Sequence, residues 1–431
     1  MNKYELNDSD ENLKLTIEND ALGRNSKLII LGKLLNNLNN NSIISIDGKW
    51  GSGKTFFIKQ FNYLIRKFNL FDDRILSEKN KEIFSRLKNN NLVVYYNAWE
   101  NDSHDNALES LIYNILNEYP KQKNQLIDFK EFKKLIKPFC RDVVHSLSNG
   151  VFDLNNIEKM NSFEDLAKNI FTIEEKKKAF NKLIDEMLID KQRLILVIDE
   201  LDRCKPTFAV EMLETIKHFY SNSKMTIIIT TNNLELSNTI RKVYGQDFDG
   251  YGYLNKFYDC VINLEVKNIK DYLQKQLNFC TKTYIYHDFS NLVMEYYNFS
   301  LRDCNRYMTF YDMLKNYIEE ECNFNEKFHY IFSCIILPLI VSAKIKNLEN
   351  YNQMVSNKGG KIIEDFINIK IIDTKYEGWL KEILKYEKDN KEWINEILQV
   401  YYSISDINNN DSTFFDAVSL LGSKLIIEEK E

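Results

Sequence analysis

Near the start of the chain, glycines, a lysine and a threonine stand in a spacing suited to binding phosphate. Residues 42–57 read SIISIDGKWGSGKTFF, a β-branched run followed by G-x-x-x-x-G-K-T. The glycines let successive backbone N–H groups point into one concavity, and the start of a helix adds its positive dipole end. Lys54 is expected to reach the β- and γ-phosphates of a nucleotide, and the Thr55 hydroxyl to bind Mg²⁺. The spacing predicts a phosphate-binding loop between a strand and a helix.

Two adjacent carboxylates form the second group that could act on a nucleotide. Asp199 and Glu200 directly follow the apolar residues 193–198. Ligands of open α/β sheets bind at the carboxyl ends of the strands. We therefore expect Asp199 to be the Mg²⁺ partner opposite Thr55, and Glu200 to orient or deprotonate the attacking water. An acidic loop without chemistry is the alternative, which the phosphate loop upstream disfavours.

The tip of the next apolar strand carries further polar side chains. Thr231 and Asn232 directly follow the apolar residues 225–230. Because the order of strands is expected to place this tip beside the phosphates, we interpret Asn232 as a polar sensor of the γ-phosphate. Ordinary turn chemistry, which asparagine-rich strand ends often supply, is the alternative.

A helix bearing two arginines is predicted in the second half of the chain. Ser300 and Asp303 form the S-x-x-D pattern of a capping box ahead of apolar residues at helical spacing. Arg302 and Arg306 share the opposite face of this helix. In a helical lid, Arg302 could fold over the phosphates; a solvated charged face is the alternative.

Strand and helix patterns alternate around these residues. Strands are predicted at 43–46, 92–96, 193–198, 225–230 and 260–264, and helices at 26–38, 107–119, 208–220 and 236–244. Such alternation indicates an α/β fold, a parallel sheet with helices on both faces. The strand at 92–96 lies in sequence between the loop strand and the Asp-Glu strand. That is typical of the P-loop NTPases that have an additional strand between those two in the sheet and a catalytic glutamate.

The predicted chain organisation has four parts. They are a loosely held N-terminal arm (1–20), a P-loop NTPase domain (21–265) with a helical insertion at about 120–190, a helical lid (266–350) and a C-terminal helical region (351–431). Residues 331–343 are the most apolar run. They are too short for a bilayer crossing and contain Pro338, so a core helix is predicted there.

Composition favours a globular protein of a reducing compartment. The net charge of the 431 residues is −6, so no global field attracts nucleic acid. The seven cysteines are scattered without metal-ligand spacing, and we interpret them as buried thiols. The polar, acidic N-terminal residues are not those of a signal peptide. A cytoplasmic location is expected.

Taken together, several segments resemble the KAP family of P-loop NTPases. They are DALGR (20–24), DGKWGSGKT (47–55), YNAWEND (96–102), VIDELDRCKP (197–206), TTNNLELSNTIRKVYG (230–245), GYGYLNKF (250–257) and SLRDCNRY (300–307). They follow the family's order over about residues 20–315. The most specific feature is the combination of Trp50 with DELDRC-x-P.

The resemblance implies binding and hydrolysis of ATP with Mg²⁺. The loop residues expected around the nucleotide are Gly48, Lys49, Trp50, Gly51, Ser52, Gly53, Lys54, Thr55 and Phe56. Gly23 and Arg24 are expected beside the adenine, and Arg302 becomes a sensor-like lid arginine. An arginine supplied by a second copy is also implied, and Arg241 and Arg302 are both candidates.

For Asp202 and Arg203 the resemblance suggests structural or switch roles in the Asp-Glu loop. Many family members carry transmembrane helices between the phosphate loop and the Asp-Glu strand, whereas residues 120–190 here are polar and interrupted. A form without a membrane span is therefore predicted. The family's links with mobile elements and phage exclusion imply a role in antiviral defence.

The leading hypothesis is a cytoplasmic, Mg²⁺-dependent ATPase that couples nucleotide state to a protein effector or to further copies of itself. The alternative is a binding switch or scaffold in which ATP is hardly hydrolysed. A nucleic-acid motor is disfavoured by the acidic charge and by the absence of an evident basic groove in the sequence.

Overall fold

The computed structural model describes residues 7–38, 41–104, 106–123, 173–188, 191–219, 222–265, 269–276, 284–321, 326–385 and 392–407. The chain forms two compact units. One, the nucleotide unit, is Arg24–Glu265, and the other, the helical unit, combines Met1–Gly23 with Val266–Glu431. Each unit has a hydrophobic core of its own.

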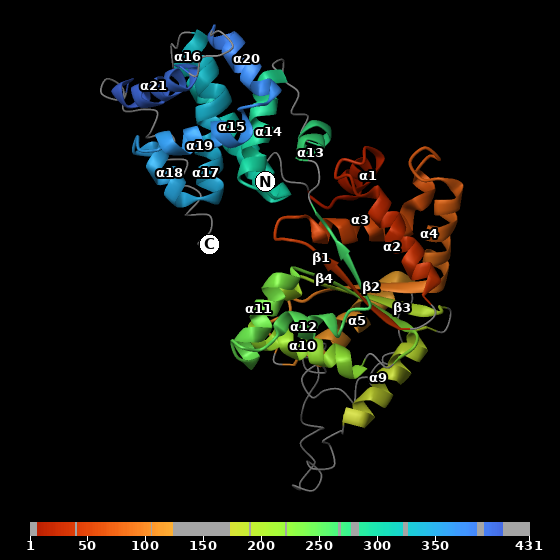
Figure 1. Ribbon diagram of the computed structural model, residues 1–431. Helices are drawn as coiled ribbons and strands as arrows, with labels where there is room; N and C mark the ends of the chain where they lie inside the picture. The colour runs from red at the N-terminus through yellow and green to blue at the C-terminus, as the bar shows by residue number, and fades with distance from the viewer. Residues whose placement is uncertain are drawn as a thin grey trace. The chain divides into compact units, whose positions relative to one another are not determined.

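The nucleotide unit is built on a five-stranded parallel sheet of order β2-β3-β4-β1-β5 (Figure 1). The strands are β1 (Ser42–Asp47), β2 (Asn91–Asn97), β3 (Arg193–Asp199), β4 (Met225–Thr231) and β5 (Cys260–Asn263). The three central strands are almost continuously buried, as expected where helices cover both faces. β4 lies between the loop strand β1 and the acidic strand β3, so the predicted additional-strand arrangement is confirmed.

Helices cover both faces of this sheet (Figure 1). On one face, α2 (Asn25–Asn37), α3 (Lys54–Lys67) and α4 (Glu78–Asn90) pack against one another. On the other lie α5 (Ala107–Lys123), α9 (Ile173–Met187), α10 (Pro206–Phe219), α11 (Asn233–Tyr244) and α12 (Gly250–Asn255). Alternate strand residues point to this second face, for example Leu194, Leu196 and Ile198 of β3, and these join its core.

Three helices are not among those predicted from the sequence. The charged stretch at 71–91 contains α4, which buries only Phe84 and Leu87 and therefore gives a weak periodic signal. The glycine-rich turn at 245–252 leads into the short helix α12, capped by Asp249. The first twenty residues were expected to be a loose arm, yet α1 (Asp10–Glu18) forms there with Ser9 as N-cap and with Leu13 and Ile17 buried.

Part of the predicted helical insertion is present as the end of α5 and as α9. The remainder, chiefly residues 124–172, lies outside the described residues.

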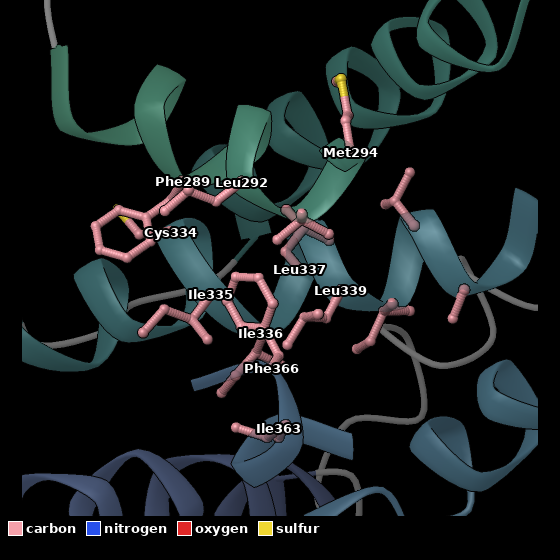
Figure 2. Packing of buried hydrophobic residues seen from close by; sticks show 14 of the residues in the cluster. Phe289, Leu292, Met294, Cys334, Ile335, Ile336, Leu337, Leu339, Ile363 and Phe366 are labelled. Atoms are coloured by element: carbon pink, nitrogen blue, oxygen red, sulfur yellow. The ribbon is translucent and has the colours of Figure 1, made fainter. Parts of the chain in front are cut away.

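The helical unit buries its own apolar cluster, part of which Figure 2 shows. Besides α1 its helices are α13 (Ile269–Gln276), α14 (Tyr284–Tyr296), α15 (Leu301–Glu321), α16 (Glu326–Ile331), α17 (Leu337–Lys346), α18 (Leu348–Val355), α19 (Gly360–Lys370), α20 (Lys375–Leu384) and α21 (Glu392–Ile407). The capping box predicted for α15 is confirmed, because Ser300 N donates to Asp303 Oδ2 over 2.9 Å and Asp303 N donates to Ser300 Oγ over 3.3 Å.

The apolar run at 331–343 is buried, as predicted for a core helix. A π-helical turn, Phe332–Ile336, joins α16 to α17 just before Pro338. Proline lacks an N–H group and crowds the preceding turn, which explains a wider turn at this point. Among the described helices, none is long and apolar enough to cross a membrane.

Replacing Phe366 of α19 by alanine should destabilise the helical unit by about 3–5 kcal/mol, since a fully buried ring would leave a cavity. Hydrogen exchange of the α19 backbone in the full chain measures the change. Ile369 provides the matched control on the same helix: its side chain is 64% exposed, and alanine there should change stability by no more than about 0.5 kcal/mol. Equal protection losses in the two variants would contradict the assigned core.

Candidate functional site

The loop between β1 and α3 has the backbone of a phosphate cradle. Gly51 and Gly53 adopt φ angles of 76° and 84°, a left-handed region that glycine enters without strain. A Cβ atom on Gly48 would lie 2.6 Å from Ser52 Oγ and 3.1 Å from the Leu264 carbonyl oxygen. A side chain at this position would displace the Ser52 hydroxyl and crowd the Leu264 carbonyl oxygen, so the closed loop favours glycine.

Lys54, the first residue of α3, lies inside this loop. Its Nζ donates a hydrogen bond to the Gly48 carbonyl oxygen over 2.7 Å, and its side chain is buried. Burial lowers the pKa of Lys54, while the charges of Asp202, Asp199 and Asp47 raise it. The ammonium group and the carboxyl end of β3 therefore lie close enough to interact, as a single nucleotide site requires.

The Asp199 carboxylate is held by donors from three directions. Tyr95 Oη donates to Oδ2 over 2.6 Å, and Glu200 N donates to Oδ1 over 2.9 Å, as does the Thr230 hydroxyl at close range. Burial and the Asp199 charge raise the pKa of Tyr95, so its hydroxyl keeps its proton at neutral pH. These contacts leave Asp199 fully buried and fixed in one orientation.

Strand register explains why these side chains meet. Asn97 of β2 stands opposite Asp199 of β3, which makes Tyr95 a diagonal neighbour on the same face. Ile229 of β4 stands opposite Ile198, so Thr230 follows at the level of Asp199. All three side chains therefore point to the face that α3 covers.

Glu200 begins the turn that follows β3. Its φ is 60°, a left-handed value that is uncommon outside glycine, and a 3-10 turn, Leu201–Arg203, continues from it. Glu200 Oε1 forms an ion pair with Arg203 Nη1 over 2.8 Å. The Arg203 guanidinium lies 5.2 Å from the centre of the Trp99 ring, just beyond the end of β2.

Trp50 links the phosphate loop to this acidic turn. Its indole Nε1 donates to Asp202 Oδ2 over 2.6 Å, although the tryptophan is 50% exposed. Burial raises the pKa of Asp202, while the Lys54 charge, the Trp50 bond and the Asn232 backbone N–H lower it. The predicted sensor Asn232 thus lies beside Asp202, at the N-terminus of α11.

Three buried polar atoms around the loop have no hydrogen-bond partner in the described part of the chain: Ser52 Oγ, Thr231 Oγ1 and Asp202 Oδ1. Thr231 adjoins the loop directly, since its carbonyl oxygen accepts from Gly48 N over 3.2 Å. Buried polar groups are otherwise almost always paired. The cradle and its orphan atoms therefore fit a polar ligand such as a nucleotide phosphate chain.

The described residues contain no cluster of three or more His, Cys, Asp or Glu side chains that could hold a metal ion. Mg²⁺ needs no such cluster, because it is commonly bound by one or two carboxylates together with substrate phosphates. Thr55, half-buried in the first turn of α3, and Asp199 are the residues that would hold it.

The other predicted nucleotide contacts lie in several places. Arg24 is buried, and its Nη1 lies 3.5 Å from the Gly53 carbonyl oxygen; burial lowers its pKa to about 10, so it stays charged at neutral pH. Gly23 ends the N-terminal segment of the helical unit with φ 61°. Lys49 is exposed and Phe56 is half-buried.

The two candidate arginines of the predicted lid or second copy belong to different units. Arg302 is exposed on α15 of the helical unit, on the face opposite the buried Cys304, Tyr307 and Met308. Arg241 is half-buried in the last turn of α11. The roles assigned to both stay predictions.

A family model for the KAP family P-loop domain matches residues 29–317. The chain belongs to this family. Comparison with curated proteins gave no match. The KAP match includes the phosphate loop and the acidic turn, and it ends within α15 of the helical unit. Membership and the cradle geometry together indicate a nucleotide-binding protein.

Sequence reasoning missed Tyr95 and Thr230 as site residues of this KAP domain. Both residues end in a hydroxyl group and stand near the carboxyl end of an apolar strand. Alternation along each strand places both side chains on the same face of the sheet as Asp199. This alternation can identify them as neighbours of Asp199 only once the register between the strands is known. Trp99 belongs to the YNAWEND segment, but its contact with Arg203 had no signal in the sequence.

Proposed function

We propose that this KAP-family protein binds ATP with Mg²⁺ in the cradle between β1 and α3 and hydrolyses it. The observation that carries the proposal is the convergence of Lys54 with Asp199 and Asp202 beside a loop that holds orphan buried polar atoms. The loop amides and the N-terminus of α3 would bind the phosphates, and Lys54 would leave the Gly48 carbonyl oxygen to neutralise them.

Asp199 and Thr55 would hold the magnesium ion, which neutralises charge on the β- and γ-phosphates. Hydrolysis requires a water oxygen to bond to the γ-phosphorus while the bond from that phosphorus to the β,γ-bridging oxygen breaks, which releases ADP and phosphate. Glu200 would orient this water and accept its proton. The left-handed backbone of Glu200 ends the alternation of β3, and its carboxylate pairs with Arg203 in the turn that follows.

Titration of the wild-type chain with ATP, with and without Mg²⁺, followed by a phosphate-release assay, tests the proposal. We expect saturable binding that Mg²⁺ strengthens, and release of one phosphate per ATP. A chain that neither binds nor hydrolyses ATP, alone or with a candidate partner, would refute it.

A binding switch with little hydrolysis is the second candidate, and the Glu200–Arg203 ion pair favours it. A carboxylate that is paired with a guanidinium at 2.8 Å is not in position to orient a water molecule. Single-turnover assays separate the two functions: a switch would retain bound ATP for much longer than it takes to bind.

Replacing Tyr95 by phenylalanine should raise the Mg²⁺ concentration for half-maximal hydrolysis about tenfold, because loss of a partner that orients a metal ligand weakens metal binding. Assays over a series of free Mg²⁺ concentrations measure this midpoint. Tyr96 is the matched control: its hydroxyl forms a hydrogen bond with Ser110 Oγ over 2.8 Å, on the face of the sheet opposite to that of Tyr95. Phenylalanine at 96 should cost about 1 kcal/mol of stability without moving the Mg²⁺ midpoint. The same shift in both variants would contradict the role of Tyr95.

We also propose that nucleotide state is passed to a protein effector or to further copies of the chain, in the cytoplasm and in the service of defence against phage. Family membership supports coupling of this kind only by analogy. An affinity pull-down of Glu200→Gln with ATP, compared with the same variant without nucleotide, tests it. Recovery of the same proteins in both samples would argue against coupling.

A further inference from the structure

Arg203 is the cation of the acidic turn, and its ion pair with Glu200 is sheltered. The two side chains are 26% and 13% exposed, and their atoms are 2.8 Å apart. Exposed pairs contribute little, whereas separating a partly buried pair leaves its charges incompletely solvated. A second anion that binds Arg203 would offset this cost when Glu200 positions water.

The surroundings of Arg203 place it on the phosphate side of the turn. Its positive charge acts on Lys54 and helps to lower the pKa of that ammonium, after burial as the main cause. The Trp99 ring, 5.2 Å from Cζ, supports the guanidinium from the side of β2. A guanidinium carries a planar fork of donors that fits a phosphate group as well as a carboxylate.

We propose that Arg203 binds the γ-phosphate of ATP in place of the Glu200 carboxylate, which it releases in doing so. This inference rests on the proposed ATP binding. ADP has no γ-phosphate, so Arg203 stays with Glu200 in the ADP state. In the ATP state Glu200 is released to orient the water, and loss of phosphate restores the ion pair. Arg203 thereby distinguishes the two nucleotides from within its own chain.

The test compares the affinities of Arg203→Gln for a non-hydrolysable ATP analogue and for ADP, both with Mg²⁺. We expect about a 10- to 100-fold loss of affinity for the analogue, the range for loss of a charge-assisted hydrogen bond, with ADP affinity within about twofold of wild type. Retained ADP binding shows that the variant is folded. Arg74→Gln is the matched control, because Arg74 also pairs with a nearby carboxylate, Asp72, but is 91% exposed. Neither affinity should change in it.

Tryptophan fluorescence gives a second readout that does not depend on hydrolysis. In the wild type, binding of the ATP analogue should move the Arg203 guanidinium away from the Trp99 ring. The tryptophan fluorescence should therefore differ from that of the ADP complex. The difference should vanish in Arg203→Gln and in Trp99→Phe.

An equal change of both affinities in Arg203→Gln, or tighter binding of the analogue, would overturn the inference while leaving ATP binding intact. A wild-type chain that binds neither nucleotide would instead refute the proposed function itself.

Discussion

Replacing Lys54 by alanine should weaken ATP binding by at least about 100-fold, which corresponds to the loss of one or more charge-assisted hydrogen bonds to phosphate. Lys54 is buried in the loop and has its Nζ within hydrogen-bond distance of the Gly48 carbonyl oxygen, so its ammonium is already in the cradle. Equilibrium titration with a fluorescent ATP analogue measures the effect.

Lys67 serves as the control for Lys54, because it lies on the same helix, α3, but in its last turn, and is exposed. Its replacement by alanine should change the affinity by less than about threefold, as expected for a solvent-screened charge. If Lys54→Ala bound ATP as the wild type does, the site would lie elsewhere. A melting temperature close to that of the wild type shows that the variant is folded.

Replacing Glu200 by glutamine should lower the single-turnover rate of hydrolysis by about 10²- to 10⁴-fold and leave ATP affinity nearly unchanged. An amide keeps the size of the side chain, and its carbonyl oxygen can still accept from Arg203, but it cannot take a proton from water. Rapid mixing with excess protein, followed by quantification of ADP, measures the rate separately from product release.

Glu100→Gln is the control for this prediction, since Glu100 is an exposed acid just beyond the end of β2. Its rate should stay within about twofold of the wild type. If Glu200→Gln kept the wild-type rate, the glutamate would not act on the water, and the binding switch would be the better account.

The local part of the site could be predicted from the sequence because its residues are contiguous. The phosphate loop and the Asp-Glu pair each occupy a few consecutive positions between a strand and a helix, so motif and context identify them together. The strands were predictable for the same reason, since β1, β3 and β4 are short segments rich in β-branched and other apolar residues.

The contacts that orient these residues could not be predicted, because they depend on the register between distant strands. Tyr95 and Asp199 are 104 positions apart and meet only when Asn97 pairs with Asp199. The bond from Trp50 to Asp202 joins positions 152 apart, and no local pattern encodes it. Helices with few buried residues, such as α4, were missed because their periodicity is weak.

The division of the chain bears on the order in which it folds during synthesis. The Met1–Gly23 segment, with α1, belongs to the same unit as Val266–Glu431. It leaves the ribosome before the sheet, but the rest of its unit is made only after the strands of the sheet have been translated. Contacts between segments so far apart form late and slowly. The nucleotide unit can thus fold while the ribosome is still at work, whereas the helical unit must wait until its last helices have emerged.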